Sequence, residues 1–341
     1  MSPSAPPTLP LPMQLMQLIT GHWVAASLFV AAKLGLADQL LTGPRSADEL
    51  ALATGAHGPS VYRLMRALAG LGVFEELPEK RFGLNLLGEL MTTDHPASMR
   101  SMALFQGSQP HWKAWGNFLH SVKTGESAFA QVHGRQFFDY TQTDPEFSEA
   151  FNGAMTGITA SAIEAVLEAY DFSGIKKLAD VGGGHGYLLS RILTHYPQMH
   201  GIVADLPHVV AGAVEPLAAA GLADRCETKG VNFFETVPLA DAYISKHIIH
   251  DWDDEHCLKI LSNMRGAVQE GGRVLLVEAV IDPHQKGSPA VMIDLEMLNS
   301  THGGRERTRQ EFAELFAKSG WRLERVIETR SIFCVIEARP A

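Results

Sequence analysis

The sequence contains few cysteines and no long uninterrupted hydrophobic run. Its three cysteines, Cys226, Cys257 and Cys334, lie far apart among 341 residues and match no metal-binding or disulfide spacing. A reducing, cytoplasmic location is therefore expected. The longest apolar run, 24–37, is interrupted by Lys33 and is too short to cross a bilayer, so we expect no membrane association. The N-terminus lacks the basic segment of a signal peptide, so no secretion is expected either.

Positive charge is also scarce. The chain has 28 Lys and Arg residues against 38 Asp and Glu residues, which gives a formal net charge of −10. Nucleic-acid binding requires a basic face that neutralises several phosphates, so this composition argues against a nucleic-acid partner. The hydrophobic fraction, 46%, is typical of a globular protein, and the length allows two domains.

The first hundred residues are predicted to be mainly helical, after a disordered lead-in over 1–12. Residues 13–41 form a helical segment that is apolar on more than one face, and a subunit interface is its simplest partner. A capping box at 46–49 begins a second helix, Pro59 begins a third, and a hairpin follows over 73–84. Two helices followed by a hairpin are typical of a winged helix. Because acidic residues slightly outnumber basic ones here, we favour dimerisation and support of a substrate pocket over DNA contact.

The next stretch, 96–170, is predicted to be helical and is rich in aromatic side chains. Packing explains most of them, but a few are expected to line a pocket for a flat ligand, because aromatic faces stack on aromatic substrates. Phe151, Asn152 and Met155 lie on one helical run and are our candidates for that pocket. Core packing suits Met155 equally well.

From residue 171 onward, apolar strands alternate with helices. Strands are expected at 177–181, 200–205, 225–229, 241–245, 273–280 and 332–338, and helices near 186–195, 207–220, 254–268 and 308–319. Repeated strand–helix–strand units predict a Rossmann-like α/β fold with a doubly wound parallel sheet and a ligand crevice at the carboxyl ends of its strands. The last strand is expected to form an edge of this sheet.

A glycine-rich turn, Asp180-Val181-Gly182-Gly183-Gly184-His185-Gly186, follows the first of these strands. Glycine adopts positive φ without strain and lets the backbone approach a ligand closely. Tyr187 replaces the third glycine of the dinucleotide motif, so the turn alone fits a cofactor loop and a plain tight turn equally well. Asp205 ends the second strand about 20 residues later, where an acid can accept both ribose hydroxyls. The combination resembles the cofactor site of S-adenosylmethionine (SAM)-dependent methyltransferases.

A second polar cluster is expected where the fourth strand ends. Asp253 or Asp254 can cap the following helix, which places His250 at a strand-to-helix corner. A lone loop histidine is often only hydrogen-bonded to a neighbour, but its position opposite the glycine turn favours a general base that takes the proton of an acceptor hydroxyl. Glu278 and Glu306 are candidates for the acid that orients the imidazole. Alternatively, Glu306 pairs with a surface arginine.

Four motifs together resemble those of the plant-type, caffeic-acid-like small-molecule O-methyltransferases and their bacterial relatives, which include phenazine and polyketide O-methyltransferases. These motifs are Asp180-Val181-Gly182-Gly183-Gly184-x-Gly186, Asp205-Leu206-Pro207-His208-Val209, Lys246-x-x-x-His250-Asp251-Trp252 and Gly303-Gly304-Arg305-Glu306-Arg307-Thr308. The resemblance implies a homodimer, a winged-helix dimerisation domain over 13–95, a helical linker and pocket region over 96–170, and a SAM-binding catalytic domain over 171–341. It implies SAM as methyl donor, S-adenosylhomocysteine as product, and no metal.

The resemblance also implies roles for individual residues. The glycine turn would hold the methionine end of SAM and Asp205 the ribose, while Asn232 and Phe233 would flank the adenine. The implied cofactor-binding set is Asp180, Gly182, Gly183, Gly184, Asp205, Leu206, Asn232, Phe233 and Lys246. The implied catalytic set is His250 as base with Glu278 and Glu306 beside it. The implied substrate-binding set is Phe151, Asn152, Met155, Asp251, Trp252, Asp294, Met297 and Thr301.

These observations lead to one hypothesis and two alternatives. The hypothesis is in-line methyl transfer from SAM to the hydroxyl of an aromatic, fused-ring metabolite such as a phenazine, polyketide or indole phenol. Some relatives that methylate nitrogen lack the histidine found here at position 250, so its presence favours a hydroxyl acceptor. The alternatives are an N- or C-methyltransferase of the same fold and a non-enzymatic, SAM-sensing winged-helix regulator.

Overall fold

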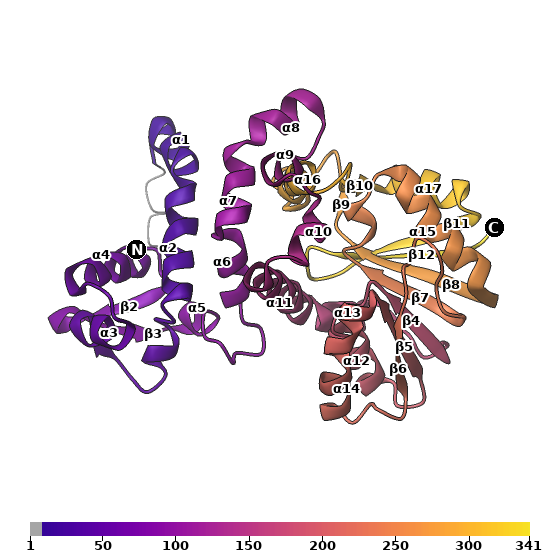
Figure 1. The fold of residues 1–341 in the computed structure, drawn as a ribbon, viewed down its shortest axis with the longest axis horizontal. Coiled ribbons are helices and arrows are strands. Elements are labelled where there is room, and N and C mark those ends of the chain that lie inside the picture. The colour runs from indigo at the N-terminus through magenta and orange to yellow at the C-terminus, as the bar shows by residue number, and fades with distance from the viewer. Residues whose placement is uncertain (1–8) are drawn as a thin grey trace, which may run out of the picture. The chain divides into compact units, whose positions relative to one another are not determined.

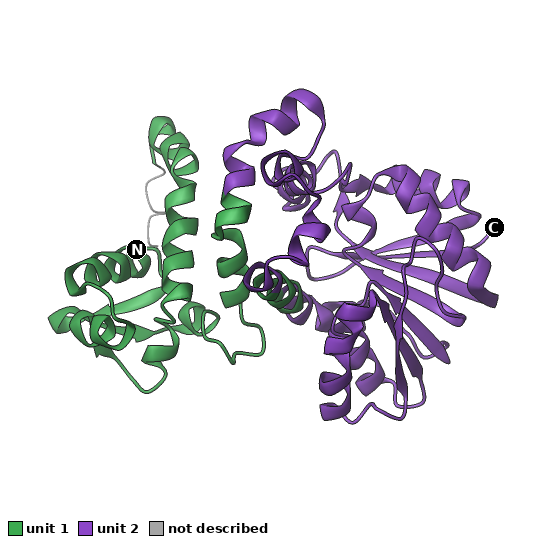
Figure 2. Ribbon diagram, viewed as in Figure 1, with its two compact units in different colours: residues 1–112, 149–157 green, residues 113–148, 158–341 purple. Residues whose placement is uncertain are grey.

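A computed structural model describes residues 9–341 of the chain (Figure 1). The disordered lead-in predicted over 1–12 lies outside the described residues as far as residue 8, and Leu11 already begins the first helix, so the lead-in does not extend to residue 12. The chain divides into two compact units (Figure 2). Unit 1 comprises 1–112 and 149–157, and unit 2 comprises 113–148 and 158–341.

Unit 1 is mainly helical and contains a small sheet in the strand order β1-β3-β2. Its elements are α1 (Leu11–Ile19), α2 (Gly21–Lys33), η1 (Asp38–Leu40), β1 (Arg45–Ser46), α3 (Ala47–Thr54), α4 (Gly58–Gly70), β2 (Phe74–Leu77), η2 (Pro78–Lys80), β3 (Arg81–Leu84), α5 (Leu86–Glu89), α6 (Arg100–Gln106) and the first part of α7 (Gln109–Gly116). The predicted capping box is present: the Ser46 hydroxyl accepts from the Glu49 amide, and the Glu49 carboxylate accepts from the Ser46 amide. The two helices and hairpin of the predicted winged helix are therefore found in order.

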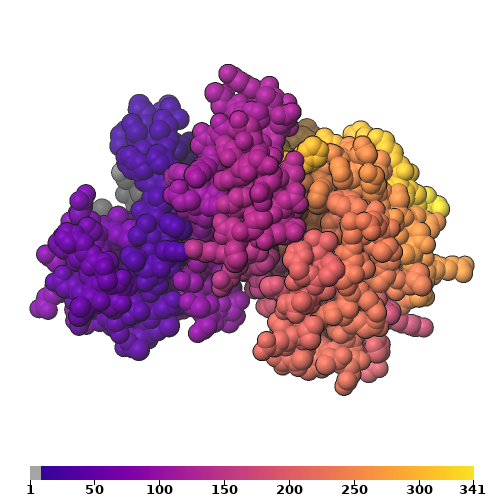
Figure 3. Space-filling model, viewed as in Figure 1, coloured from indigo at the N-terminus to yellow at the C-terminus, as the bar shows by residue number. Residues whose placement is uncertain are grey.

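The first two helices of unit 1 expose apolar side chains. The chain breaks at Thr20 into α1 and α2, where a single helical segment was predicted. Leu18 is 79% exposed and Trp23 is 64% exposed, and Figure 3 shows α1 at the surface of unit 1. Within residues 9–341 no single helix is long and apolar enough to cross a membrane, although α1 and α2, which meet at 43°, pass that test of length and composition together.

Aromatic side chains hold α9, α10 and α11 together at the start of unit 2. The helices there are α8 (Phe118–Thr124), α9 (Ala128–His133), α10 (Phe137–Thr141) and α11 (Pro145–Ala169), whose residues 149–157 belong to unit 1. The ring of Phe129 contacts those of Phe137, Tyr140 and Phe147, with centroids 5.1–5.9 Å apart. Packing is thus the role of this aromatic group, as predicted for most aromatics of the stretch.

The rest of unit 2 is an α/β fold around a seven-stranded sheet in the order β11-β12-β8-β7-β4-β5-β6. Its strands are β4 (Lys177–Val181), β5 (His200–Asp205), β6 (Cys226–Gly230), β7 (Ala240–Lys246), β8 (Val268–Glu278), β11 (Trp321–Glu328) and β12 (Cys334–Pro340). Its helices are α12 (Tyr187–His195), α13 (Pro207–Val210), η3 (Ala211–Ala213), α14 (Val214–Ala219), η4 (Ile249–Asp251), α15 (Asp254–Ala267), α16 (Ala290–Ser300) and α17 (Arg309–Lys318). A short parallel pair, β9 (Val280–Ile281) and β10 (Arg307–Thr308), lies beside it.

Two predictions about this α/β region are wrong, one about a strand and one about a helix. The last strand, β12, is not an edge, because it pairs antiparallel with β8 on one side and with β11 on the other. The edge is β11, whose mixture of exposed polar and buried residues gave no clear strand signal. The single helix predicted over 207–220 is instead three short pieces, α13, η3 and α14.

The sheet separates two apolar cores. Alternation along β4 directs Leu178 into one core, with Leu189 of α12, and Ala179 into the other, with Ile260 of α15. Helices therefore cover both faces (Figure 1), and the central strands β5, β4, β7 and β8 run parallel. Their carboxyl ends meet at one edge of the sheet, where the predicted glycine turn and His250 both lie.

Candidate active site

The glycine turn that follows β4 requires glycine at several positions. Gly182, Gly184 and Gly186 have φ values of 76°, 57° and 76°, which side-chain-bearing residues rarely adopt. A Cβ atom on Gly182 would collide with the side chain of Ile248, so the turn lies directly against the segment that leads to His250. A Cβ on Gly184 would meet no atom within 4 Å. The turn is therefore close-packed on one side and open at Gly184.

Two aspartates stand beside this turn. The carboxylate of Asp205 accepts hydrogen bonds from the amides of Gly184 at 2.9 Å and Leu206 at 2.7 Å, which fixes the end of β5 against the turn. Each of its oxygens keeps a further lone pair for a hydroxyl donor. Asp180 is buried, and its Oδ2 has no hydrogen-bond partner among the described residues. Burial, together with the charge of Asp205, raises the pKa of Asp180 to about 7.

The predicted adenine and lysine contacts lie on neighbouring elements. The side chain of Asn232 is engaged within its own turn, because its Oδ1 accepts from the Phe234 amide and its Nδ2 donates to Glu235. The ring of Phe233 lies edge-on to that of Trp252, with centroids 6.3 Å apart. Whether Asn232 and Phe233 flank an adenine stays a prediction.

Lys246 ends β7 in a poorly solvated position. Its ammonium lies over the ring of Phe333, 5.1 Å from the centroid. Burial lowers the pKa of Lys246 to about 8, against the opposing effect of Glu278, Asp180 and Asp251. The predicted contact between this lysine and SAM is not tested by these distances.

His250 lies on η4, directly after β7, and is 5% exposed. Its Nδ1 is 2.6 Å from Oε1 of Glu306 and 4.0 Å from Oε2 of Glu278. Its Nε2 is 3.5 Å from a carboxylate oxygen of Asp251. Both predicted acids therefore lie beside the imidazole, and Glu306, rather than pairing with a surface arginine, is the one that hydrogen-bonds it. Oε1 of Glu278 accepts from the amides of Ile248 and Ile249, at 3.1 and 3.0 Å, and so holds the turn in place.

The three carboxylates determine the protonation of His250. Burial by itself lowers the pKa of an imidazole, but Glu306, Glu278 and Asp251 outweigh that effect and raise the pKa of His250 to about 10. Burial in turn raises the pKa of Glu278 to about 7 and that of Asp251 to about 6, with His250 acting against both shifts. These groups share protons within one buried cluster. A cation placed beside the cluster would lower the pKa of His250, because like charges disfavour the imidazolium.

A second histidine, His247, lies against His250 and was missed by the sequence analysis. The two rings stack with centroids 4.5 Å apart and 29° between their planes. Burial holds the pKa of His247 well below its usual value, helped by Lys246 and His250. Its φ of 54° is unusual for a residue with a side chain. Nothing in the sequence around position 247 indicates that conformation.

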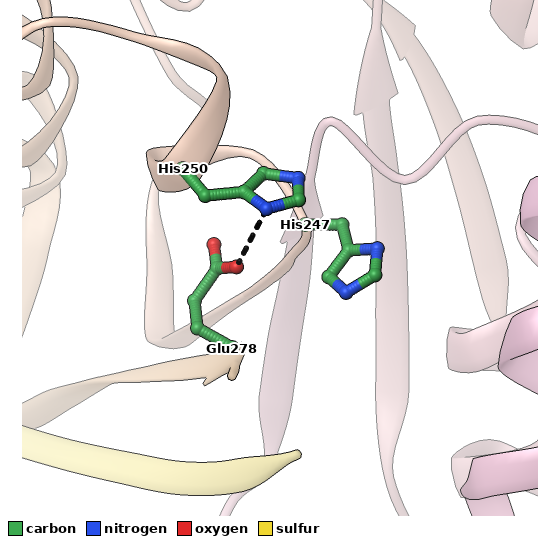
Figure 4. A group of neighbouring side chains, drawn as sticks. All are labelled: His247, His250 and Glu278. Atoms are coloured by element: carbon green, nitrogen blue, oxygen red, sulfur yellow. Dashed lines mark ion pairs between the residues drawn. The ribbon is translucent and has the colours of Figure 1, made fainter. Parts of the chain in front are cut away.

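His247, His250 and Glu278 also form a set of potential metal ligands (Figure 4). Each offers one ligand atom, and these atoms lie within 4.8 Å of one another. Imidazole and carboxylate ligands suit transition metals, but Nδ1 of His250 is already hydrogen-bonded to Glu306. That no metal is needed stays a prediction.

The predicted substrate residues on α16 and at its C-terminal end form hydrogen bonds or pack within the protein. Oδ1 of Asp294 accepts from the Glu306 amide at 2.9 Å, which makes Asp294 a support for the acid that contacts His250. Met297 is 8% exposed, and the Thr301 hydroxyl donates to the Met297 carbonyl. Contact of these three residues with a substrate stays a prediction.

The other predicted substrate residues lie in two places. The ring of Trp252 stacks on Phe138 with centroids 5.7 Å apart, which builds an aromatic surface one residue beyond Asp251. Phe151, Asn152 and Met155 lie on the part of α11 that belongs to unit 1. Their predicted contact with substrate is not tested by the structure of either unit.

Two protein-family models match the chain, and both describe O-methyltransferases. Residues 115–322 match the model of the O-methyltransferase domain, and residues 16–94 match that of the O-methyltransferase dimerisation domain. The chain therefore belongs to the O-methyltransferase family with this pair of domains. It is a SAM-dependent O-methyltransferase, as the resemblance implied.

Individual relatives extend the likeness over nearly the whole chain. The phenazine O-methyltransferase PhzM of Lysobacter antibioticus is 44% identical over 333 residues, 97% of each protein. The 8-amino-8-demethylriboflavin N,N-dimethyltransferase of Streptomyces davaonensis is 33% identical over 93% of this chain and 92% of that protein. The crystal structure of LaPhzM superposes with a TM-score of 0.94 at 43% identity, covering 98% of this chain and 100% of that one. An O-methyltransferase from neocarzinostatin biosynthesis, solved with SAM and 2-hydroxy-5-methyl naphthoic acid, has a TM-score of 0.78 at 30% identity, covering 93% and 96%.

Proposed function

We propose that this enzyme methylates a hydroxyl of an aromatic, fused-ring metabolite, a phenazine or polyketide phenol, with His250 as general base. The observation that supports this most is the buried imidazole of His250, hydrogen-bonded to Glu306, at the same edge of the sheet as the glycine turn. The two features are physically joined, because Ser245 donates to the Val181 carbonyl at 2.8 Å and Ile248 packs on Gly182.

The residues around the glycine turn fit the methionine and ribose parts of SAM. The buried, unpartnered oxygen of Asp180 would accept from an ammonium group. The remaining lone pairs of Asp205 would accept from ribose hydroxyls. The open side of Gly184 leaves room for close approach of a ligand. When bound, SAM supplies a methyl group on a sulfonium, which is already an electrophile with a neutral thioether as leaving group.

The protein then has to make the acceptor nucleophilic and align it. Nδ1 of His250 is held by Glu306, so Nε2 is the nitrogen that takes the proton of the acceptor hydroxyl. As that proton moves to Nε2, the O–CH3 bond forms and the C–S bond breaks, which leaves S-adenosylhomocysteine. The raised pKa of His250, about 10, keeps the imidazole protonated near neutral pH in the free protein. Bound SAM would place a sulfonium cation near it, and like charges lower the pKa of an imidazolium, so the neutral base would become available once the donor is bound. Glu306 stabilises the imidazolium that results from proton transfer.

The exposed apolar surface of α1 and α2 supports a homodimer as part of this proposal. Leu11, Leu18 and Trp23 are 77%, 79% and 64% exposed. These helices fall largely within the range that matches the dimerisation domain, and a second copy of the chain would remove their side chains from water. A cytoplasmic location without a nucleic-acid or membrane partner remains our expectation from composition.

An amine acceptor is the second candidate, because one relative is an N,N-dimethyltransferase of a riboflavin derivative. The two candidates differ in what they require of position 250. Loss of a proton from a phenol needs a base before or during transfer, whereas a neutral amine can attack first and release its proton afterwards. Retention of activity without the imidazole would therefore favour the amine.

Mass spectrometry tests the proposal directly. The enzyme is incubated with methyl-labelled SAM and a panel of hydroxylated and aminated phenazines, naphthoates and indoles, and the site of the label is determined. We expect the label on oxygen. His250→Ala is expected to lower kcat by about 10²–10⁴-fold while the Kd for SAM stays unchanged, and His302→Ala, a change at an exposed histidine nearby, serves as the control. Turnover that survives in His250→Ala contradicts the proposal.

A further inference from the structure

The turn that carries His250 is fixed by groups from outside it. On its N-terminal side, Glu278 binds the amides of Ile248 and Ile249. The carbonyl of His250 itself accepts from the Arg305 amide at 2.8 Å. The carbonyls of Ile249 and Trp252, on either side of the histidine, are both bound by the Arg307 guanidinium. The buried thiol of Cys257 adds a weaker contact to each of the two. The direction of the imidazole therefore depends on the elements that hold this backbone.

Arg307 is 1% exposed, which is rare for an arginine. Its guanidinium uses Nη1 for the carbonyls of Ile249 at 2.9 Å and Arg305 at 3.3 Å. Nη2 donates to the Trp252 carbonyl at 2.9 Å and to Asp254 at 2.7 Å, and Nε donates to the same carboxylate oxygen at 3.2 Å. An arginine has five N–H donors in a rigid planar fork, and these contacts account for all five.

This geometry is specific to arginine. A lysine ammonium has three donors on a flexible stem and cannot bind two carbonyls on opposite sides of His250 and a carboxylate in one plane. Burial of the charge costs free energy unless it is paired, and Asp254, the first residue of α15, provides that pairing. Asp254 also binds Arg305, whose side chain otherwise reaches Glu311. Both arginines thus pair with Asp254, but of the two side chains only that of Arg307 reaches the Ile249 and Trp252 carbonyls.

Close backbone packing allows Arg307 to reach the turn. A Cβ atom on Gly304 would lie 2.5 Å from the His250 carbonyl oxygen and 2.7 Å from the Asp251 carbonyl carbon. Trp252 and Gly303 also form an antiparallel bridge. The segment 303–307 therefore lies directly against the turn. Its glycines allow this close packing, which places the side chains of Arg307 and Glu306.

We propose that Arg307 is a positioning residue for the general base: by holding the Ile249 and Trp252 carbonyls it directs the His250 imidazole toward the acceptor hydroxyl. This inference rests on the proposed function, because it assigns Arg307 a role through His250. Arg307 does not touch the reacting atoms. It should therefore affect kcat, which depends on the alignment of the base, and leave SAM affinity almost unchanged.

The first experiment compares Arg307→Lys with the matched variant Arg305→Gln, which loses the contact of Arg305 with Asp254 but keeps the Arg307–Asp254 ion pair and both carbonyl contacts. For Arg307→Lys we expect kcat to fall by about 10–100-fold, because small misplacements of a catalytic group have effects of this order. The KM for the acceptor and the Kd for SAM should change by less than about threefold, and Arg305→Gln should keep kcat within about twofold. An unchanged kcat in Arg307→Lys overturns the inference, as does an equal loss in both variants.

A double-mutant cycle separates this inference from the proposed function. If Arg307 acts through His250, Arg307→Lys costs no further activity in the His250→Ala background. A further loss there overturns the inference. Turnover that survives in His250→Ala alone refutes the proposed function instead, whatever Arg307→Lys does.

Two further measurements keep the test decisive if Arg307→Lys does not fold. Asp254→Asn retains the buried arginine but removes its counter-charge, and we expect the same loss of kcat with SAM affinity kept. Guanidinium ion added to Arg307→Ala should restore part of the lost kcat, because the cation can occupy the vacated position. Unchanged kcat in Asp254→Asn, or no rescue in a folded Arg307→Ala, overturns the inference.

Discussion

Two regions of the molecule depart from ordinary surface and core composition in opposite directions. Helices α1 and α2 expose large apolar side chains, including Leu18 at 79%. The neighbourhood of His250 buries groups that proteins usually expose, with Glu278 at 0% and Glu306 at 3%. The first region lacks a covering surface, so we expect another protein there. The second lacks partners for buried polar atoms, so we expect a ligand there.

Burial without hydrogen-bond partners costs free energy in the second region, and the atoms concerned can be named. Asp180 Oδ2, His247 Nε2, Glu278 Oε2 and Glu306 Oε2 are buried without a hydrogen-bond partner in the described residues. Each such atom is destabilising by about 1–3 kcal/mol. These four atoms lie near one edge of the sheet. This part of the fold therefore lowers the free energy of unfolding, as is common at functional sites.

The largest expected effect comes from breaking the buried region at Glu306. Glu306→Gln replaces a carboxylate with an amide, which cannot stabilise an imidazolium and can impose the wrong tautomer on His250, so kcat should fall by about 10²–10⁴-fold. A carboxylate 2.6 Å away favours the protonated imidazole. Its loss should therefore move the rising limb of the pH–rate profile to lower pH, by about one to three pH units. Glu314→Gln, on the exposed face of α17, is the control, and a limb that moves to higher pH contradicts the assignment.

Asp205 offers the next test of the buried region. Asp205→Ala should weaken SAM binding by about 1–3 kcal/mol, the contribution of a hydrogen bond to a charged group, or roughly 5- to 150-fold in Kd. Calorimetric titration measures this effect. Asp224→Ala, at an exposed aspartate before the opposite end of β6, should bind SAM normally. Equal affinities in both variants would show that the ribose lies elsewhere.

The exposed region is tested by placing a charge on it. Leu18→Lys should weaken self-association roughly tenfold or more, because each buried leucine contributes about 1.5–3 kcal/mol. Sedimentation at several protein concentrations measures the change. Leu71→Lys, at another exposed leucine of unit 1, should leave the assembly intact. A wild-type chain that sediments as a monomer would remove the dimer from the proposal.

The smallest expected effect sharpens the question of what the buried region binds. His247, His250 and Glu278 have the chemistry of metal ligands, yet we expect dialysis against a chelator to change kcat by less than about twofold. Methyl transfer from a sulfonium needs no Lewis acid to activate the donor. Loss of activity that a divalent transition metal restores would instead place a metal in this group.

Much of this architecture could be predicted from the sequence, because it depends on residues that lie close together in the chain. The capping box at Ser46, the glycine turn and the apolar strands around Asp180 each follow from residues close in the chain. Elements without such signals were missed. Helix α16 begins after Pro289 with no capping side chain, and β11 is a polar edge strand.

The site was less predictable than the fold, because its key contacts join distant segments. The sequence pointed to His250 but could not decide between Glu278 and Glu306. The hydrogen bond to Glu306 joins residues 56 positions apart, and the positive φ of His247 has no sequence signature. Arg307 stood within a recognised motif, but its five contacts depend on how that motif packs against the turn at 249–252.

The contact between Gly182 and Ile248 bears on how such an enzyme can diversify. The ring of Phe138, which stacks on Trp252, lies on α10, outside the strands of the sheet. A side chain at position 182 would instead strain a backbone held at a φ of 76° and would collide with the Ile248 side chain, next to the amide that Glu278 binds. A change of acceptor range is therefore expected from exchanges in the aromatic surface, while the packing of the glycine turn against the segment that leads to His250 has to be kept.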